Sequence, residues 1–273
     1  MLYKKIAISL VFIAITAFCN QSSAQTLDHL PGYKFNPKNI PFLSKYKVTS
    51  DNINFEGRDV VGIQRETTFQ NNNNIISIYI HIAQNKTPNA SNIIKNIISN
   101  RFLSTGFAYN KKDHKKIGIG EVLYVSVLGP INGKITSRVL FSRNNIVVKI
   151  LNKTTTGPKQ NIEPLAKQID KDIDNAVKVT LKEIEAYKPI IEKFNLDKKD
   201  IKEYTQIKLT IQIKDPNKKS TQFFYETKGD VIEENGQYLF DSPTKLGKNT
   251  LTIVVVNDHL IYSEKTIEFT VIK

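Results

Sequence analysis

Residues 138–150 read RVLFSRNNIVVKI, and this stretch decides the fold of the first half of the chain. Two apolar runs flank Arg143, Asn144 and Asn145, and asparagine tolerates the positive φ that a tight turn requires. The stretch therefore predicts a β-hairpin. A third apolar run precedes it, so we expect a three-stranded meander formed by residues 119–128, 135–142 and 146–151.

Outside this meander, the sequence predicts a second hairpin and two helices. The hairpin consists of residues 60–69 and 75–83, with an asparagine-rich turn at residues 70–74. Apolar residues spaced by three and four predict a helix at 91–103 and a longer one at 162–187. The resulting order ββαβββα indicates an α+β fold, in which helices cover an antiparallel sheet.

From residue 204 the pattern changes to short strands separated by turn residues. Strands are predicted at residues 207–213, 222–225, 237–240, 249–256 and 265–272. This spacing is typical of a small all-β sandwich. The chain therefore divides into a signal peptide (1–24), an extended lead-in (25–46), an α+β domain (47–188), a linker (189–203) and a β-sandwich (204–273).

The first 24 residues have the three parts of a secretory signal peptide. Lys4 and Lys5 precede an apolar run, which is followed by small residues that end at Ala24. We therefore expect export to the periplasm, the cell surface or the extracellular space. Cys19 leaves open a lipoprotein, although Phe18 stands where that processing needs a small residue. No later run is long enough to predict a transmembrane helix.

Positive charge is concentrated in the first half of the mature chain. The 273 residues include 39 Lys and Arg against 26 Asp and Glu, and residues 25–150 hold 17 basic and 7 acidic residues. Such a surface attracts anionic polymers or acidic proteins, although a solvated lysine-rich loop that maintains solubility is the alternative. The candidate anion-binding residues are Lys111, Lys112, Lys115, Lys116, Arg138 and Arg143.

The sequence lacks the common signatures of catalysis and cofactor binding. The four histidines are not at metal-ligand spacing, and neither a phosphate-binding loop nor a serine nucleophile elbow occurs. Cys19, the one cysteine, lies in the predicted signal peptide. We therefore expect no enzyme, no cofactor and no metal. Four carboxylates leave open a glycoside hydrolase, namely Glu56, Asp59, Glu66 and Glu121.

Tyr79 and His81 alternate with isoleucines in the predicted strand at residues 75–83, so they share its less apolar face. They either line a binding surface or cover a half-buried face of the sheet.

Two segments resemble known families. Residues 247–258, GKNTLTIVVVND, followed by TIEFTV at 266–271, resemble the last strands of bacterial Ig-like surface modules. Residues 138–150, followed by LAKQID at 165–170, are similar to the PsbP-like α/β sandwich of exported bacterial proteins. The first resemblance implies a spacer, adhesion or docking module, and the second implies a non-catalytic assembly or binding factor.

The sequence thus predicts a non-catalytic accessory or binding protein of the bacterial envelope or secreted fraction. It would act through contacts with an envelope or secreted protein partner. Two alternatives remain: the basic N-terminal domain binds a polyanion such as polysaccharide, lipopolysaccharide or nucleic acid, or the chain is a hydrolase of envelope polymers.

Overall fold

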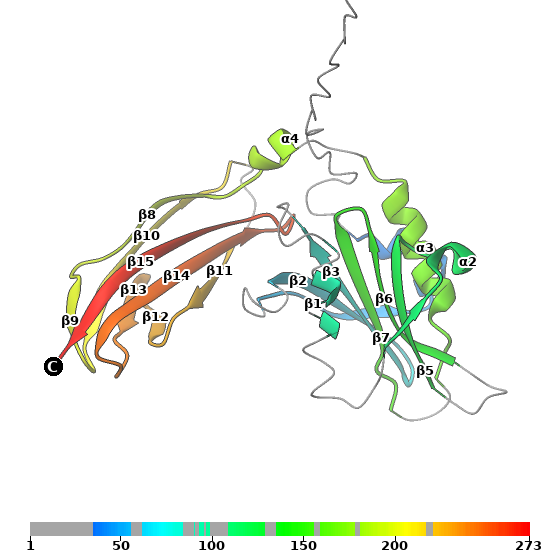
Figure 1. Ribbon diagram of the computed structural model, residues 1–273, viewed down its shortest axis with the longest axis horizontal. Helices are drawn as coiled ribbons and strands as arrows, with labels where there is room; N and C mark the ends of the chain where they lie inside the picture. Colours follow the sequence, from blue (N-terminus) through cyan, green and yellow to red (C-terminus); the bar gives the residue numbers. More distant parts are fainter. Residues whose placement is uncertain are drawn as a thin grey trace, which may run out of the picture.

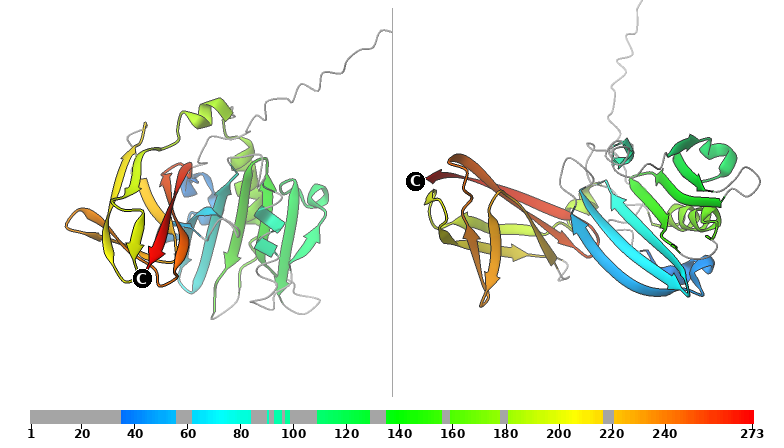
Figure 2. Two further views of the ribbon diagram at one scale, coloured as in Figure 1. Left: turned by 60° about the vertical axis from the view of Figure 1, so that its left-hand side comes forward. Right: turned by 90° about the horizontal axis from the view of Figure 1, so that it is seen from below.

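A computed structural model describes ten parts of the chain, namely residues 35–55, 62–83, 90, 93–95, 97–98, 109–128, 135–155, 159–177, 181–216 and 221–273. The predicted signal peptide with Cys19 and the first part of the predicted lead-in (25–34) lie outside these residues. Figures 1 and 2 show two bodies side by side, an N-terminal domain coloured blue to green and a C-terminal module coloured yellow to red.

A seven-stranded antiparallel sheet, in the order β1-β2-β3-β7-β6-β5-β4, forms the N-terminal domain. Its strands are β1 (Lys47–Phe55), β2 (Ile63–Asn71), β3 (Asn74–Ile82), β4 (Asn110–Lys112), β5 (Val122–Leu128), β6 (Ile135–Arg143) and β7 (Ile146–Asn152). The other elements are the 3-10 turns η1 (Pro37–Asn39) and η2 (Pro41–Leu43) and the helices α2 (His114–Ile117) and α3 (Glu163–Asp174).

Asparagine turns connect the two predicted hairpins, as the sequence indicates. Asn72 has a φ of 51° between β2 and β3, and Asn144 has a φ of 52° between β6 and β7. Both values lie in the left-handed region, which suits the tight turn of an antiparallel pair. The prediction of both hairpins is therefore confirmed.

Helix α3 covers one face of this sheet because its apolar stripe needs burial. Leu165, Ile169 and Ile173 are fully buried and belong to the same core as the alternate isoleucines of β3. The opposite face carries Leu140 and Val147, which pack with isoleucines of residues 93–97. The sheet is therefore buried on both faces, which explains why β7 is apolar throughout most of its length.

The prediction of a helix-covered α+β fold with the order ββαβββα is wrong, because the described chain is mostly β. The helix predicted at 162–187 ends at Asp174, and Val177 is 65% exposed. After Ile173, Ala176 is only partly buried against this core and Val177 is exposed, so the apolar stripe weakens there and its periodicity does not extend the helix. The order also omits β1 and β4, whose largely exposed residues lack the apolar alternation of a buried strand.

Two four-stranded sheets pack face to face in the C-terminal module. One sheet has the order β12-β13-β10-β8 and the other β11-β14-β15-β9, and β9 pairs in parallel with β15. Their core includes Phe194, Phe240, Leu251 and Phe269. The strands are β8 (Ile190–Leu196), β9 (Asp200–Lys202), β10 (Gln206–Lys214), β11 (Thr221–Glu226), β12 (Asp230–Glu234), β13 (Gln237–Asp241), β14 (Gly247–Asn257) and β15 (Tyr262–Ile272). This arrangement is compatible with an Ig-like sandwich.

The segment predicted as a linker, residues 189–203, contains strands β8 and β9. Charged side chains occupy the outward positions of these strands, while Phe194 and Ile201 are buried in the sandwich. High charge and a leading proline therefore conceal two short strands from composition alone. The short helix α4 (Leu181–Glu185) precedes them.

The tip of the β14–β15 hairpin connects the two bodies. Val254, Val256 and Leu260 belong to the core of the N-terminal domain rather than to that of the sandwich. The ring centroids of Phe224 in the module and Phe55 in the N-terminal domain are 5.8 Å apart. Arg65 also donates a hydrogen bond of 3.4 Å to the backbone oxygen of Asp258. The C-terminal module thus completes the core of the N-terminal domain.

The hairpin tip also holds the segment that joins the two bodies. Asn257 donates a hydrogen bond of 2.8 Å to the backbone oxygen of Tyr187, and Ser263 donates one of 2.5 Å to that of Pro189. Ile261 packs against Ile184 of α4. These contacts fix where the chain enters β8.

No helix among the described segments is both long and apolar enough to span a membrane.

Because β14 faces two cores, adjacent substitutions should have different consequences. Val255→Ala and Val256→Ala each remove two methyl groups from a fully buried site, so each should lower the free energy of unfolding by about 2 kcal/mol. In native-state hydrogen exchange, Val256→Ala should accelerate exchange in β1 and β2, whereas Val255→Ala should do so in β10 and β13. Unchanged exchange in β1 and β2 of the Val256→Ala variant would contradict this junction.

Candidate functional site

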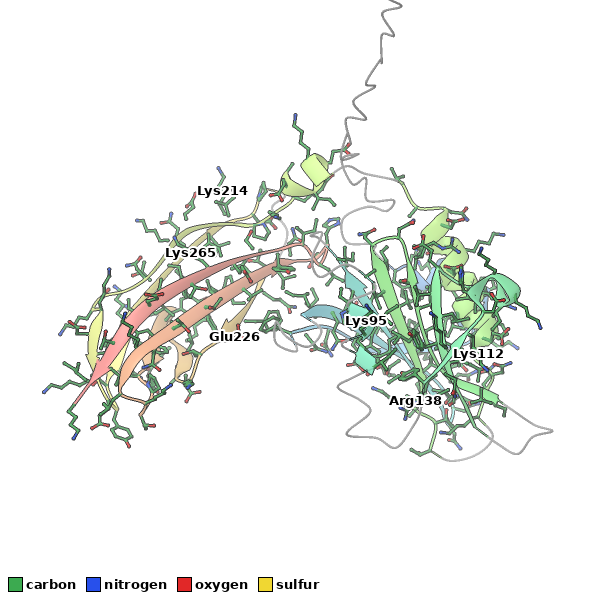
Figure 3. All side chains as sticks on the ribbon, viewed as in Figure 1. Lys95, Lys112, Arg138, Lys214, Glu226 and Lys265 are labelled. Atoms are coloured by element: carbon green, nitrogen blue, oxygen red, sulfur yellow. The ribbon has the colours of Figure 1, made fainter. Side chains whose placement is uncertain are left out.

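Four of the predicted anion-binding residues lie together at one edge of the seven-stranded sheet. Lys111 and Lys112 are on β4, the last strand of the sheet, and Lys115 and Lys116 are on α2, which follows after one residue. All four side chains are exposed. We call these four residues the basic edge; Figure 3 labels Lys112 within it.

Local hydrogen bonds hold the basic edge in shape. The Asp113 carboxylate accepts hydrogen bonds from the backbone N–H groups of Lys115 (3.0 Å) and Lys116 (3.3 Å), and so caps the first turn of α2. Nδ1 of His114 lies 3.0 Å from the backbone oxygen of Gly120, and Gly118 ends the helix with a φ of 73°. The backbone that carries the lysines is therefore fixed at both ends.

Carboxylates elsewhere in the N-terminal domain are engaged with other cations. Asp51 binds Arg65 at 2.6 Å, Glu66 binds Lys153 at 2.8 Å, and Glu163 binds Lys167 at 3.0 Å. Within the described parts of the chain, no carboxylate lies within 4.0 Å of a basic-edge lysine. The basic edge therefore presents four ammonium groups without an ion pair among the described residues, and Asp113, which caps α2, is the single acidic residue in the run of residues 111–116.

Arg143, a predicted anion-binding residue, forms a salt bridge within the domain. Its Nε and Nη2 bind the two carboxylate oxygens of Asp170 on α3, at 2.8 and 2.5 Å, and Nη1 lies 3.8 Å from Asp174. Asp170 has only 5% of its side chain exposed, so its charge needs this partner. The hydrogen bond to Asp170 is the main cause that raises the pKa of Arg143. This residue fastens α3 to the sheet.

Arg138 lies apart from the basic edge. It is on β6, two strands in from β4, and pairs with Ser126 of β5 and Leu151 of β7. Along β6 it lies three residues from Phe141, the residue in the same register row as Lys112. Arg138 is partly buried and faces the side of the sheet opposite α3, whereas Arg143 faces α3. The structure therefore brings together four of the six predicted residues.

The Arg143–Asp170 bridge leads to a prediction about the stability of the fold. Arg143→Met leaves a buried carboxylate without its cation, so the free energy of unfolding should fall by about 3 kcal/mol. The double variant Arg143→Met/Asp170→Leu should recover part of that loss. Urea denaturation measures both. A single variant as stable as the wild type would show that the bridge has no structural role.

A polar cluster on the face of the sheet opposite α3 joins Tyr79 and Glu66, which the sequence pointed to separately, with Lys149 and Lys153, which it did not. Lys149 is 1% exposed, and its Nζ lies 3.7 Å from the centroid of the Tyr79 ring. The Nζ of Lys153 lies 5.4 Å from the same centroid, and this lysine binds Glu66. Glu66, Tyr79 and Lys149 stand in one register row across β2, β3 and β7, so alternation combined with strand pairing would have found them.

Tyr79 and His81 do not form an open binding surface. They are 6% and 1% exposed, and Nδ1 of His81 lies 3.2 Å from the backbone oxygen of Ile63. Burial is the main cause that raises the pKa of Tyr79. The cluster therefore stabilises the sheet through a cation held over an aromatic ring and a hydrogen-bonded ion pair.

Glu66 is the member of this cluster whose ionisation affects stability at acidic pH. Burial raises the pKa of Glu66, but hydrogen bonds from Lys153, Tyr79 and Ser77 and the charge of Lys153 outweigh it, so the net direction is downward. A lowered pKa in the folded state means that the charged form stabilises the fold above the pKa of the unfolded state. This contribution is lost as the pH falls through the folded-state value.

Glu66→Gln should lower the free energy of unfolding by about 1 kcal/mol at neutral pH, because Lys153 is partly exposed and solvent weakens the pair. The difference should persist above about pH 5 and shrink below about pH 4. Chemical denaturation across this range measures it, with Glu192→Gln as the control for loss of one exposed negative charge. A pH-independent difference would contradict an ionised Glu66.

Neither catalytic nor metal-binding geometry emerges at these places. The described residues contain no group of three or more His, Cys, Asp or Glu side chains that could hold a metal ion. Glu56 and Asp59, two of the four carboxylates considered for hydrolysis, lie outside them. Glu66 binds Lys153, and Glu121 accepts a hydrogen bond of 3.2 Å from the backbone N–H of Asn144. The basic edge is therefore the candidate site that remains.

Comparison with known protein families and with curated proteins found no match.

Proposed function

We propose that the chain is an exported, non-catalytic binding protein whose basic edge holds an anionic polymer. One observation carries the proposal: the ammonium groups of Lys111, Lys112, Lys115 and Lys116 are exposed on a fixed backbone and lack carboxylate partners among the described residues. Four such groups in a run of six residues create a local positive potential that attracts extended anions.

The position of the basic edge supports this role. The opposite side of the sheet, at β1 and β2, is occupied by the C-terminal module through Phe224 and Asp258. Strand β4 lies at the far end of the strand order, away from that contact. An Ig-like module in this arrangement would act as a spacer or docking unit and leave the basic edge open to its ligand.

The side chains of the basic edge favour recognition by charge. Between Asn110 and Gly118 the chain contains no Phe, Tyr or Trp, and the half-buried Tyr124 of β5 is the ring that pairs opposite Lys111, so this segment offers mainly charge rather than rings for base stacking. Lysines on a short edge strand also discourage pairing with a partner strand. A polymer with regularly spaced phosphate, sulfate or carboxylate groups needs neither stacked bases nor strand pairing to bind here. An anionic envelope polysaccharide is such a polymer.

Binding should therefore depend on the four lysines and on salt. With double-stranded DNA as a probe of regularly spaced phosphates, four contacts give a slope of about −3.6 in log K against log salt. Affinity should fall about 100-fold between 50 and 200 mM salt. The quadruple variant Lys111→Gln/Lys112→Gln/Lys115→Gln/Lys116→Gln should remove most of the binding and of this slope, as fluorescence anisotropy would show.

The matched control changes four exposed lysines of the C-terminal module to glutamine and so removes the same net charge: Lys193, Lys199, Lys202 and Lys208. This control should bind DNA and an anionic polysaccharide such as heparin nearly as well as the wild type. Equal losses in the two quadruple variants would show that net charge alone drives binding, and would overturn the proposal.

A protein partner at the other edge of the sheet is the second candidate function. Strand β1 is nine residues long and ends the strand order. Its last residue, Phe55, contacts the C-terminal module, but residues 47–49 at its other end are exposed, with Val48 at 50%. This exposed part of the edge can accept a strand from another protein. A partner held there should remain bound to the quadruple lysine variant at high salt in a pull-down, whereas an anionic polymer should not.

A further inference from the structure

A pocket on the C-terminal module gathers three lysines that the proposed function does not use. Its volume is about 550 Å³, which is within the range of small-molecule sites. Lys228 comes from the turn after β11, Lys245 from the segment before β14, and Lys248 from β14 itself. Lys245 and Lys248 are neighbours in sequence, and the fold brings Lys228 to them from the turn after β11.

The two turns that carry Lys228 and Lys245 are held firmly by their neighbours. Gly229 packs so closely on β13 that an added Cβ would lie 2.2 Å from the backbone oxygen of Asp241. The buried side chain of Asn249 donates hydrogen bonds to the backbone oxygens of Lys245 (2.8 Å) and Gly247 (2.9 Å). The positions from which both lysines extend are therefore fixed before any ligand binds.

Lys228 and Lys245 line the same pocket despite their like charges. The interaction with the Lys245 side chain and its positive charge lower the pKa of Lys228. Both side chains are exposed. An anion bound between the two ammonium groups would replace this repulsion with two charge-assisted hydrogen bonds.

The remaining lining residues define the rest of the ligand. Glu226 at the end of β11, labelled in Figure 3, and Glu268 on β15 contribute carboxylates to the pocket, and Thr250 contributes a hydroxyl. Carboxylates repel an anion but accept hydrogen bonds from hydroxyl groups. A ligand that suits the whole pocket therefore carries one compact, doubly charged group and several hydroxyls.

We propose that this pocket binds the phosphate monoester of a sugar, with the phosphate against Lys228, Lys245 and Lys248 and the sugar hydroxyls against Glu226 and Glu268. A phosphate monoester carries a charge of about −1.5 to −2 at neutral pH, which matches the paired ammonium groups. The pocket is separate from the basic edge, so this inference is independent of the proposed function.

Isothermal titration calorimetry of the full chain tests the proposal with glucose 1-phosphate, inorganic phosphate and glucose. Glucose 1-phosphate should bind, inorganic phosphate should bind more weakly, and glucose should not bind. Lys228→Gln/Lys245→Gln should weaken binding of glucose 1-phosphate by about tenfold or more, because two charge-assisted hydrogen bonds are lost. Both positions are exposed, so the variant should remain folded, which circular dichroism checks.

The matched control is Lys193→Gln/Lys208→Gln, which removes the same charge from exposed positions of the same module outside the pocket and should leave the affinity for glucose 1-phosphate unchanged. Phosphatidylcholine vesicles with and without a phosphorylated glycolipid distinguish a membrane headgroup from a soluble sugar phosphate as the source. The proposal would be overturned if neither glucose 1-phosphate nor the glycolipid vesicles bound, if glucose bound as well as glucose 1-phosphate, or if the two double variants had equal effects.

Discussion

Strand β14 is the element on which the whole arrangement depends, because its two faces belong to two different cores. Leu251, Ile253 and Val255 point into the sandwich, whereas Val254 and Val256 enter the core of the N-terminal domain. An apolar run buried on both faces is characteristic of a central strand. Here the two faces of one strand are buried in two different bodies of the protein. The junction is thus stabilised by burial of apolar surface as well as by hydrogen bonds.

The two bodies also differ in how their charged side chains are paired. In the N-terminal domain, four carboxylates are bound to specific cations, namely Asp51, Glu66, Glu163 and Asp170, and Asp113 caps a helix. What is left at the end of the sheet is positive because the acidic residues are engaged elsewhere. The C-terminal module, by contrast, mixes lysines with glutamates around its pocket. The pocket proposed for a small ligand therefore contains charges of both signs, whereas the surface proposed for a polymer is mainly positive.

Local patterns predicted the parts of the fold that depend on neighbours in sequence. The turns at Asn72 and Asn144 and the alternation of β3 were readable because each is decided within a few residues. The end of α3, the edge strands and the strands hidden in the charged segment before residue 204 depend on which surface lies opposite them. Four lysines of the candidate site were found from charge density, but the role of Arg143 required knowledge of Asp170 on α3.

The two-faced hairpin has a consequence for the order in which the protein reaches its final form. Residues 254–260, which complete the core of the N-terminal domain, follow β7, the last strand of its sheet, by about 100 residues. A ribosome releases all seven strands of that sheet before these residues exist, so the sheet closes its core only after β14 has been made. Contacts this distant in sequence also slow folding, since the chain between them must be ordered first. The N-terminal domain therefore reaches its full stability only together with the C-terminal module.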